Sequence, residues 1–286
     1  MMPNNVMLMK TADSPSGQRT TSPQFDTSVA HPARVYAYWI GGKDHYEADR
    51  RAATEVIRVR PQVVAGARAN RALLARVVRY LAADCGIRQF LDIGVGLPAP
   101  GSTHEVAQQV DPACRVVYVD NDQMVLTHAR ALLTCTAPGS CDYVDADVRD
   151  PSAILAGVAH TLDLAQPVAV LLLAILHFLG DADDPAGIVA RLAGGLAPGS
   201  FIALSHLTGD FAPGQVTAAV TVYNAQVSAS VTPRTHTQVS ALFRGLPLVA
   251  PGVVPVTQWR PVVGGLPHRM TADLYAGVAR VGRGHR

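Results

Sequence analysis

The sequence contains few cysteines, and their spacing matches no common metal or disulfide pattern. The four stand at positions 85, 114, 135 and 141 of 286 residues. No pair has the C-x-x-C spacing of a zinc site, and no group of histidines lies beside them in the sequence. A scattered set of this kind is typical of free thiols in the core or on the surface. We therefore expect neither a disulfide nor a metal site.

The sequence also lacks an excess of charge of one sign and a long apolar run. Lys and Arg number 24 against 22 for Asp and Glu, which gives a net charge of +2 and indicates no basic surface for nucleic acid or anionic lipid. The longest apolar run, 168–176, is far shorter than the ~20 residues of a membrane-spanning helix. Residues 1–24 are polar and lack the apolar core of a signal peptide. We expect a cytoplasmic protein with no nucleic acid or membrane partner.

What is present is an alternation of strand-length apolar runs with helical patterns, which predicts an α/β domain with a parallel sheet. The segment 168–175 contains no polar residue, so we expect it to be the central strand, covered on both faces. Expected strands are 89–93, 115–119, 141–145, 168–175, 200–205, 246–249 and 274–279. Expected helices within this region are 103–110, 124–133, 151–160, 185–196, 216–227 and 235–243.

The chain divides into three expected parts. Residues 1–28 are predicted to be a disordered tail, because they are polar and carry Pro, Ser, Thr and Gly. Residues 29–84 hold three helical patterns, at 31–40, 46–58 and 65–83, and are predicted to form an N-terminal helical lid. Residues 85–282 are predicted to form the main, cofactor-binding domain.

A strand followed at once by two glycines organises the main domain. The segment 88–97 reads Arg-Gln-Phe-Leu-Asp-Ile-Gly-Val-Gly-Leu, with Asp92 near the strand end and glycines at Gly94 and Gly96. Glycines there let the backbone approach a ligand closely, at the edge where α/β sheets bind ligands. Ala99 nearly completes a dinucleotide fingerprint, which leaves a nicotinamide cofactor as an alternative. A carboxylate directly before this turn is more typical of S-adenosylmethionine sites, where it binds the amino-acid ammonium.

The next two strands also end in acids. Asp120 follows the second strand and is predicted to accept hydrogen bonds from ribose hydroxyls, with Asn121 beside it. After the third strand, Asp147 and Val148 are predicted to hold the adenine amino group and pack against its ring. Asp122 is better explained as the N-cap of the following helix.

Two histidines follow later strands and have two interpretations each. His177 and His206 stand at the strand ends where a methyl acceptor would lie, so either could act as a general base or position the substrate. Each could equally be a structural histidine with satisfied ring nitrogens.

The N-terminal segment offers a second cofactor contact. Tyr36, Tyr38 and Trp39 precede the turn Gly41-Gly42-Lys43-Asp44; aromatic faces stabilise a sulfonium cation, and Lys43 could pair with the cofactor's carboxylate. The alternative is that the rings belong to the core and Lys43 is solvated.

Taken together, these segments resemble one known family. They comprise 31–44 (His-Pro-Ala-Arg-Val-Tyr-Ala-Tyr-Trp-Ile-Gly-Gly-Lys-Asp), 69–71 (Ala-Asn-Arg), 90–98, 117–122 and 176–178, with Pro251-Gly-Val-Val-Pro255 and Trp259-Arg-Pro261 near the end. The set resembles the actinobacterial S-adenosylmethionine-dependent methyltransferase family formerly described as a domain of unknown function. Trp39, His45 and Val95 depart from its commoner residues.

The resemblance implies a Rossmann-like class I methyltransferase. It implies a seven-stranded, mostly parallel sheet with one antiparallel strand at the end, helices on both faces and an N-terminal helical lid. It also implies cofactor contacts at Asp92, Gly94, Gly96, Asp120 and Asp147, closed over by 36–43, which includes Tyr36, Gly42 and Lys43.

The expected function is transfer of a methyl group from S-adenosylmethionine to a small-molecule acceptor, with a role in secondary metabolism. Alternatives are an NAD-dependent oxidoreductase, a non-catalytic cofactor-binding module, and a methyltransferase fold used for a non-methylating reaction. The sequence leaves assembly into a homo-oligomer open.

Overall fold

The computed structural model describes residues 26–132, 135, 137–261 and 272–282. The tail predicted at 1–28 therefore lies, except for its last three residues, outside the described part. None of the helices within these ranges is both long and apolar enough to cross a membrane.

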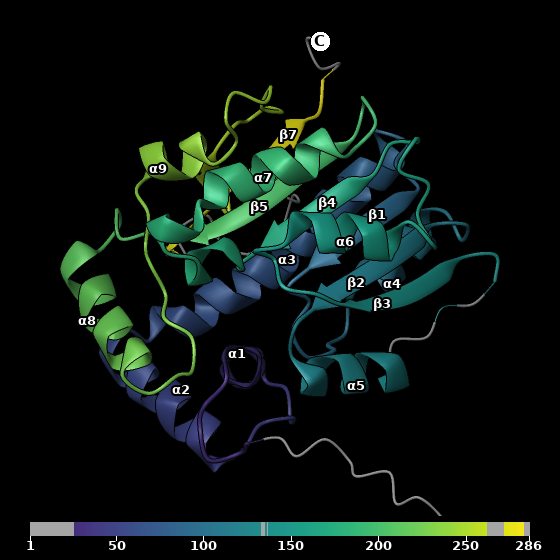
Figure 1. Cartoon of the computed structure of the whole chain (residues 1–286). Helices are drawn as coiled ribbons and strands as arrows, with labels where there is room; N and C mark the ends of the chain where they lie inside the picture. Colours follow the sequence, from purple (N-terminus) through teal and green to yellow (C-terminus); the bar gives the residue numbers. More distant parts are fainter. Residues whose placement is uncertain (1–25, 133–134, 136, 262–271, 283–286) are drawn as a thin grey trace, which may run out of the picture.

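A seven-stranded sheet forms the centre of the molecule (Figure 1). Its order is β3-β2-β1-β4-β5-β7-β6, with β7 antiparallel to both of its neighbours and the remaining pairs parallel. β4 is the middle strand and its first four residues are fully buried, which confirms the predicted central strand. The strands are β1 Gln89–Ile93, β2 Arg115–Asp120, β3 Ser140–Asp145, β4 Ala169–Leu173, β5 Phe201–Leu207, β6 Val254–Pro255 and β7 Leu274–Arg280.

Helices cover both faces of the sheet, as predicted (Figure 1). One core cluster joins Leu91, Val117 and Val170 to α6, α7 and α9, and a second joins Phe90 and Val116 to α3 and α4. Each strand alternates its apolar side chains between these two layers. The helices are α3 Gln62–Ala83, α4 Thr103–Val110, α5 Gln123–Leu132, α6 Pro151–Val158, α7 Pro185–Gly194 and α9 His236–Ala241; two 3₁₀ turns, η1 Leu176–Phe178 and η2 Asp181–Asp183, follow β4.

A third core lies at one end of the sheet, under what we call the cap: α1 Pro32–Ile40, α2 Glu47–Val59 and α8 Pro213–Asn224. Val35, Val56 and Tyr223 are buried there, and residue Ala30 pairs with Val227 in an isolated parallel bridge. The group of helices at this end therefore differs from the lid expected at 29–84 in two respects. α3 shares its core with the sheet, whereas α8, from the other half of the chain, completes the cap.

The last expected strands are only partly confirmed. Residues 246–249 run beside β7 but form only the Leu248–Ala279 bridge, so the strand predicted there is wrong. The short edge strand is instead β6, at the end of the segment Pro251-Gly-Val-Val-Pro255. Pro247 lacks an N–H for a ladder and Pro251 follows closely, which limits regular pairing at 246–249.

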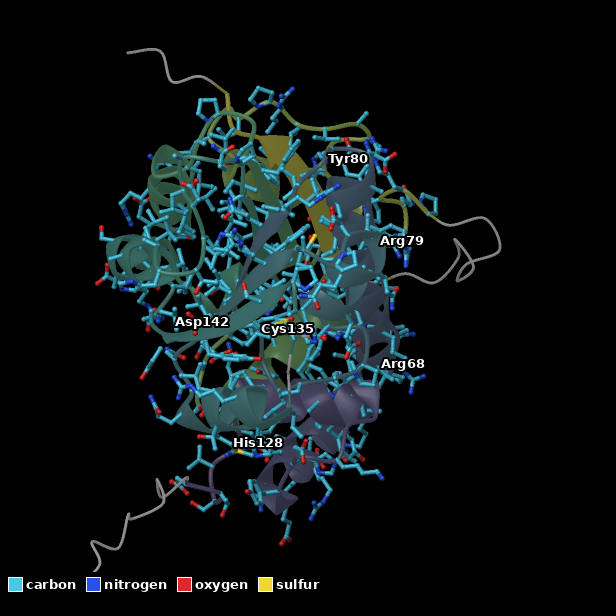
Figure 2. All side chains as sticks on the ribbon, turned by 90° about the vertical axis from the view of Figure 1, so that its right-hand side faces the viewer. Arg68, Arg79, Tyr80, His128, Cys135 and Asp142 are labelled. Carbon is cyan, nitrogen blue, oxygen red and sulfur yellow. A yellow bond between two sulfur atoms is a disulfide. The ribbon has the colours of Figure 1, made fainter. Side chains whose placement is uncertain are left out.

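The expectation that no cysteine forms a disulfide is wrong for two of the four. Cys135, labelled in Figure 2, forms a disulfide with Cys141, and their Cα atoms are 5.6 Å apart. Cys85 and Cys114 are free. Cys141 lies on β3 and Cys135 on the connection that leads into it. The C-x5-C spacing gave no signal, because the approach depends on how that connection returns to the sheet.

Candidate functional site

A cavity of about 380 Å³ lies between the carboxyl ends of β1, β2 and β4 and the cap. Its sheet side is polar and includes Asp92, Gly94, Gly96 and Asp120. Its cap side is mainly apolar and is lined by Trp39, Val56, Val216, Ala219, Val220 and Tyr223, with Val63 of α3 beside them. The charged residues on this side are Arg60 and Asp273, which neutralise each other as an ion pair. The cavity is thus divided between groups that bind charge and hydroxyls and groups that bind apolar surface.

The turn after β1 requires its two glycines for different reasons. Both have positive φ, +74° at Gly94 and +64° at Gly96, which favours glycine. A Cβ at Gly94 would lie 2.7 Å from the Ile175 side chain, so this position is closed by the protein itself. A Cβ at Gly96 would meet no protein atom within 4 Å. Since Gly96 lines the cavity, the space beside it is available to a ligand.

Asp92 is a buried carboxylate with room for a cationic partner. Its side chain lies in the cavity wall, and Oδ2 accepts a hydrogen bond of 2.7 Å from Thr103 Oγ1 at the start of α4. Burial raises the pKa of Asp92 to about 6, against the lowering effects of the Thr103 hydroxyl and the nearby Arg71 guanidinium. The group is therefore mainly ionised at neutral pH, and an ammonium ion would offset its desolvation.

Two residues of α3 supply polar groups that the sequence interpretation had not assigned. Arg71 lines the cavity, and its Nη2 donates to the carbonyl oxygens of Ala99 and Pro100 at 3.2 and 3.1 Å. Asn70 also lines the cavity; its Oδ1 accepts from Ser205 Oγ at 2.6 Å and its Nδ2 donates to Tyr36 Oη at 3.3 Å. Both belong to the Ala-Asn-Arg segment at 69–71 that is part of the family resemblance, and this segment is the feature of the sequence that could have indicated them.

Asp120 joins two loops at the end of β2. Its Oδ2 accepts from the Gly96 N–H at 3.1 Å, and its Oδ1 accepts from the Asp122 N–H at 3.0 Å. Burial raises the pKa of Asp120 to about 6, against the lowering effect of these backbone donors. A carboxylate has about four acceptor positions, so it can also accept from a pair of hydroxyl groups. Asp122 caps α5 by accepting from the Met124 N–H at 2.8 Å, as predicted.

The segment after β3 contributes apolar surface, and its acid points elsewhere. Val148 is buried and lines the cavity, with Asn121 and Arg149 beside it. Asp147 is not among the lining residues: it accepts from Asn121 Nδ2 at 3.0 Å and pairs with Arg149 at 3.2 Å. Asp147 therefore holds the side chains of Asn121 and Arg149, which line the cavity, and is not itself in the cavity wall.

The N-terminal segment reaches the cavity through Tyr36 and Trp39, but not through its Gly-Gly turn. Tyr36 Oη donates to the Ala67 carbonyl at 3.0 Å, which fixes the ring in the wall. Gly42 and Lys43 are absent from the lining; the Gly42 N–H donates to the Ala37 carbonyl at the end of α1, and Lys43 is exposed. The turn directs Lys43 toward solvent, so the geometry does not support its predicted contact with a carboxylate.

The two histidines have different surroundings. His177, on η1, lines the cavity, and its buried Nδ1 has no hydrogen-bond partner among the described residues. Burial, together with His206 and Arg234, lowers the pKa of His177 well below its usual value. The ring is therefore neutral, and the lowered pKa makes it a weak base whose unprotonated nitrogen can still accept a hydrogen bond.

His206 does not line the cavity and is fully buried. Its Nδ1–H donates to the Leu207 carbonyl at 2.8 Å, and its Nε2 accepts from Arg234 Nη1 at 3.0 Å. Both ring nitrogens are engaged, and burial lowers the pKa of His206 to about 4. This geometry favours the structural interpretation, so we no longer assign His206 a role as a base.

The chain is similar to known proteins both in sequence and in fold. A family profile described as S-adenosyl methyltransferase matches residues 18–282. Among solved structures, a DUF574 family protein from Streptomyces avermitilis is 45% identical, with a TM-score of 0.85, over 89% of this chain and 98% of that one. A Thermobifida fusca protein, provisionally assigned as a methyltransferase, is 37% identical with a TM-score of 0.82 over 93% and 100%.

A more distant structure is similar in fold alone. It is an S-adenosylmethionine-dependent methyltransferase from Anabaena variabilis, 14% identical with a TM-score of 0.51 over 74% of this chain and 84% of that one. No curated protein sequence gives a significant match. The family match confirms the resemblance of the motifs and favours S-adenosylmethionine over the nicotinamide alternative.

Proposed function

The chain belongs to the S-adenosyl methyltransferase family, and we propose that it methylates a small, largely apolar molecule bound beneath the cap. The fold is that of the class I methyltransferases, and S-adenosylmethionine is the cofactor. The proposal for the acceptor is carried by one observation: the cavity is polar at the strand ends and mainly apolar under the cap, where the charges of Arg60 and Asp273 are paired. A volume of about 380 Å³ is in the range of small-molecule sites.

The residues at the strand ends fit the cofactor. Asp92 would bind its ammonium group and Arg71 its carboxylate, because each offers the opposite charge in the cavity wall. Asp120 would accept from the ribose hydroxyls, and Val148 would pack against the adenine ring. The open space at Gly96 would let the cofactor contact the backbone.

The acceptor would lie on the apolar side. When bound, the cofactor supplies a methyl group already activated on a sulfonium, so the main task of the protein is to align the acceptor and exclude water. Trp39, Phe178 and Tyr223 provide apolar and aromatic surface there. His177 is the neutral group placed to accept a proton if the acceptor must lose one.

Two further expectations remain predictions from the sequence: a cytoplasmic location and a role in secondary metabolism. Assembly into a homo-oligomer stays open.

Calorimetric titration with S-adenosylmethionine, S-adenosylhomocysteine and NADH tests the cofactor site. We expect the two adenosyl ligands to bind and NADH not to bind. Replacing Asp92 by Asn should weaken adenosyl binding about 10- to 100-fold, the range for a hydrogen bond to a charged group. Asp145→Asn is the matched control, since Asp145 is an exposed acid at the end of β3, two strands away from Asp92 in the same sheet.

A panel of small aromatic and aliphatic acceptors then tests methyl transfer, with S-adenosylhomocysteine release as the readout. Equal binding by wild type and Asp92→Asn would contradict the site assignment. Normal cofactor binding with no transfer to any acceptor would favour a non-catalytic module or a non-methylating reaction.

A further inference from the structure

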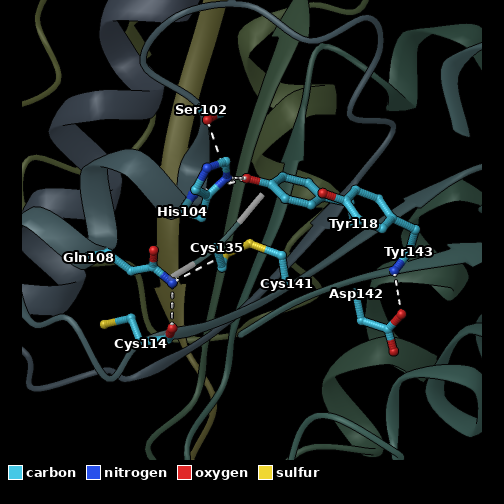
Figure 3. Close-up of a disulfide and its surroundings, with 9 residues drawn as sticks. All are labelled: Ser102, His104, Gln108, Cys114, Tyr118, Cys135, Cys141, Asp142 and Tyr143. Atoms are coloured by element: carbon cyan, nitrogen blue, oxygen red, sulfur yellow. Dashed lines mark hydrogen bonds between the residues drawn. A yellow bond between two sulfur atoms is a disulfide. The ribbon is translucent and has the colours of Figure 1, made fainter. Parts of the chain in front are cut away.

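A second cluster of reactive side chains lies outside the cavity, between α4 and β3. One ring nitrogen of His104 and the sulfurs of Cys135 and Cys141 all lie within 4.8 Å of one another (Figure 3). The three residues come from separate parts of the fold: α4, the connection after α5, and β3. The proposed methyl transfer uses none of them.

The disulfide explains why the two sulfurs lie close together, but it does not explain why His104 lies beside them. His104 is buried, and its Nδ1 lies 2.8 Å from Tyr118 Oη and 3.3 Å from Ser102 Oγ. The other ring nitrogen, Nε2, makes no hydrogen bond to the described residues, and the His104 backbone N–H donates to Tyr118 Oη at 3.0 Å. In the tautomer in which Nδ1–H also donates to Tyr118 Oη, Nε2 carries the lone pair, which is the arrangement by which metal-binding histidines are oriented.

A further group is directed at the sulfurs. Gln108 lies one turn after His104 on α4, so that both side chains lie on the same face of the helix. Its Nε2 donates to the Cys114 carbonyl at 3.0 Å and to Cys135 Sγ at 3.3 Å (Figure 3). A donor aimed at sulfur stabilises a thiolate more than a disulfide sulfur, because the thiolate carries a full charge.

We propose that, once the disulfide is reduced, Cys135, Cys141 and His104 bind one Zn²⁺ ion. Two thiolates and one imidazole are the ligands that Zn²⁺ favours, and the ion's fourth position would be open to water. The bound ion would join α4 to β3 and to the connection before it. It would thereby hold the first turn of α4, where Thr103 donates to Asp92.

Binding of Zn²⁺ requires that the disulfide is reduced first. A phosphine reductant and one water convert the disulfide into two thiols and a phosphine oxide. Zn²⁺ then replaces the two thiol protons, which are released to solvent. The oxidised form, with both sulfurs bonded to each other, cannot provide the two thiolates.

The test is metal binding by the full chain in its reduced and oxidised forms. Reduced protein, freed of metal by a chelator, is titrated with Zn²⁺ and in parallel with Co²⁺. We expect one ion per chain by elemental analysis, and thiolate-to-cobalt charge-transfer and tetrahedral d–d absorption. Oxidised wild type, with the disulfide verified by mass, should bind no ion at this site.

Substitutions assign the ligands. Cys141→Ser and Cys135→Ser should each abolish the charge-transfer band or reduce it by about half, because each removes one thiolate. Cys85→Ser, which removes a free thiol outside the cluster, should behave like wild type. Tyr118→Phe should lower the affinity for Zn²⁺ about 10- to 100-fold, the usual effect of losing the partner of a ligating histidine.

Stability in the absence of metal separates ligand loss from misfolding. Thermal unfolding of each variant is measured without metal and with added Zn²⁺, with Mg²⁺ as the control ion. Wild type should gain stability from Zn²⁺ by mass action, and the serine variants should not. Failure of reduced wild type to bind Zn²⁺, or unchanged binding by both serine variants, would overturn the proposal and leave the pair as a disulfide only.

Discussion

Arg60 and Asp273 form a buried, bidentate ion pair although 213 residues separate them in the sequence. Arg60 Nε donates to Oδ2 at 2.9 Å, and Nη2 donates to Oδ1 at 3.0 Å. Arg60 caps the end of α2 and also donates to Gln215 on α8, whereas Asp273 directly precedes β7. One guanidinium therefore fixes the cap to the sheet at the wall of the cavity.

Removing one partner of this pair should destabilise the protein strongly. Asp273→Asn leaves the Arg60 charge buried without a carboxylate, and we expect a loss of about 3–5 kcal/mol in the free energy of unfolding. Urea denaturation measures it. The control is Glu55→Gln, which breaks an exposed pair with Arg58 and should change stability by less than about 1 kcal/mol. Similar losses in the two variants would contradict the role of the buried pair.

Cofactor affinity should depend on pH through Asp92. Because the ionised carboxylate binds an ammonium and its pKa is about 6, affinity should be constant above that pH and should fall below it. Each further pH unit costs about tenfold. Binding constants for S-adenosylhomocysteine between pH 5 and 8 measure this. The Asp92→Asn variant should retain only the part due to other groups, such as Asp120; an unchanged profile would contradict the assignment.

The raised pKa of Asp92 also affects the free energy of unfolding, which it increases at low pH, whereas it decreases cofactor affinity there. The folded-state pKa of Asp92 lies above its unfolded value, so the folded protein holds this proton more tightly between about pH 4 and 6. Stability from this group is full below pH 4 and is lost as the pH rises through 6. Relative to wild type, Asp92→Asn should gain on the order of 3 kcal/mol between pH 4 and 7. Urea denaturation at both pH values checks it, and a constant difference would contradict it.

The two glycines of the β1 turn should respond differently to alanine. Gly94→Ala adds a Cβ that meets Ile175 in a left-handed conformation, so we expect a loss of about 2–5 kcal/mol in stability. Gly96→Ala meets no protein atom and should cost only about 1–2 kcal/mol for the backbone conformation. It should instead weaken cofactor binding by tenfold or more. Denaturation and calorimetry on both variants distinguish them; normal cofactor binding by Gly96→Ala would contradict the open-space argument.

Replacing His177 and replacing His206 should have different effects, the first on catalysis and the second on stability. With an identified acceptor that loses a proton, His177→Ala should lower kcat about 10²- to 10⁴-fold and leave cofactor affinity unchanged. Near wild-type turnover would exclude the role. His206→Ala should act on folding, since it removes the buried acceptor of Arg234, with a loss of about 1–3 kcal/mol.

The sheet and one edge of the cavity were predictable because they depend on local patterns. Apolar runs of strand length, alternating with helical patterns, predicted the strands, and the carboxyl ends of parallel strands meet at one edge. Asp92, Asp120 and His177 were therefore expected near one another, and all three line the cavity. Their roles toward the cofactor and acceptor stay predictions.

The parts that the sequence did not predict depend on how the chain folds back on itself, mostly between residues far apart in the sequence and, for the disulfide, between residues six positions apart. The packing of α8 on α2, the Arg60–Asp273 pair and the Cys135–Cys141 disulfide have no local pattern. Lys43 and Asp147 were assigned to the site from their neighbours in sequence. A turn and an arginine direct these two side chains away from it.

The pairing of α2 with α8 has a consequence for how the protein is made. A chain emerging from the ribosome presents residues 29–59 early, but the helix that covers their apolar face begins only at Pro213. Because synthesis proceeds at about 5–20 residues per second, the nascent chain exposes this surface for roughly ten seconds or more. The cofactor cavity becomes enclosed only near the end of translation, so an incomplete chain has no finished site in which to hold the cofactor.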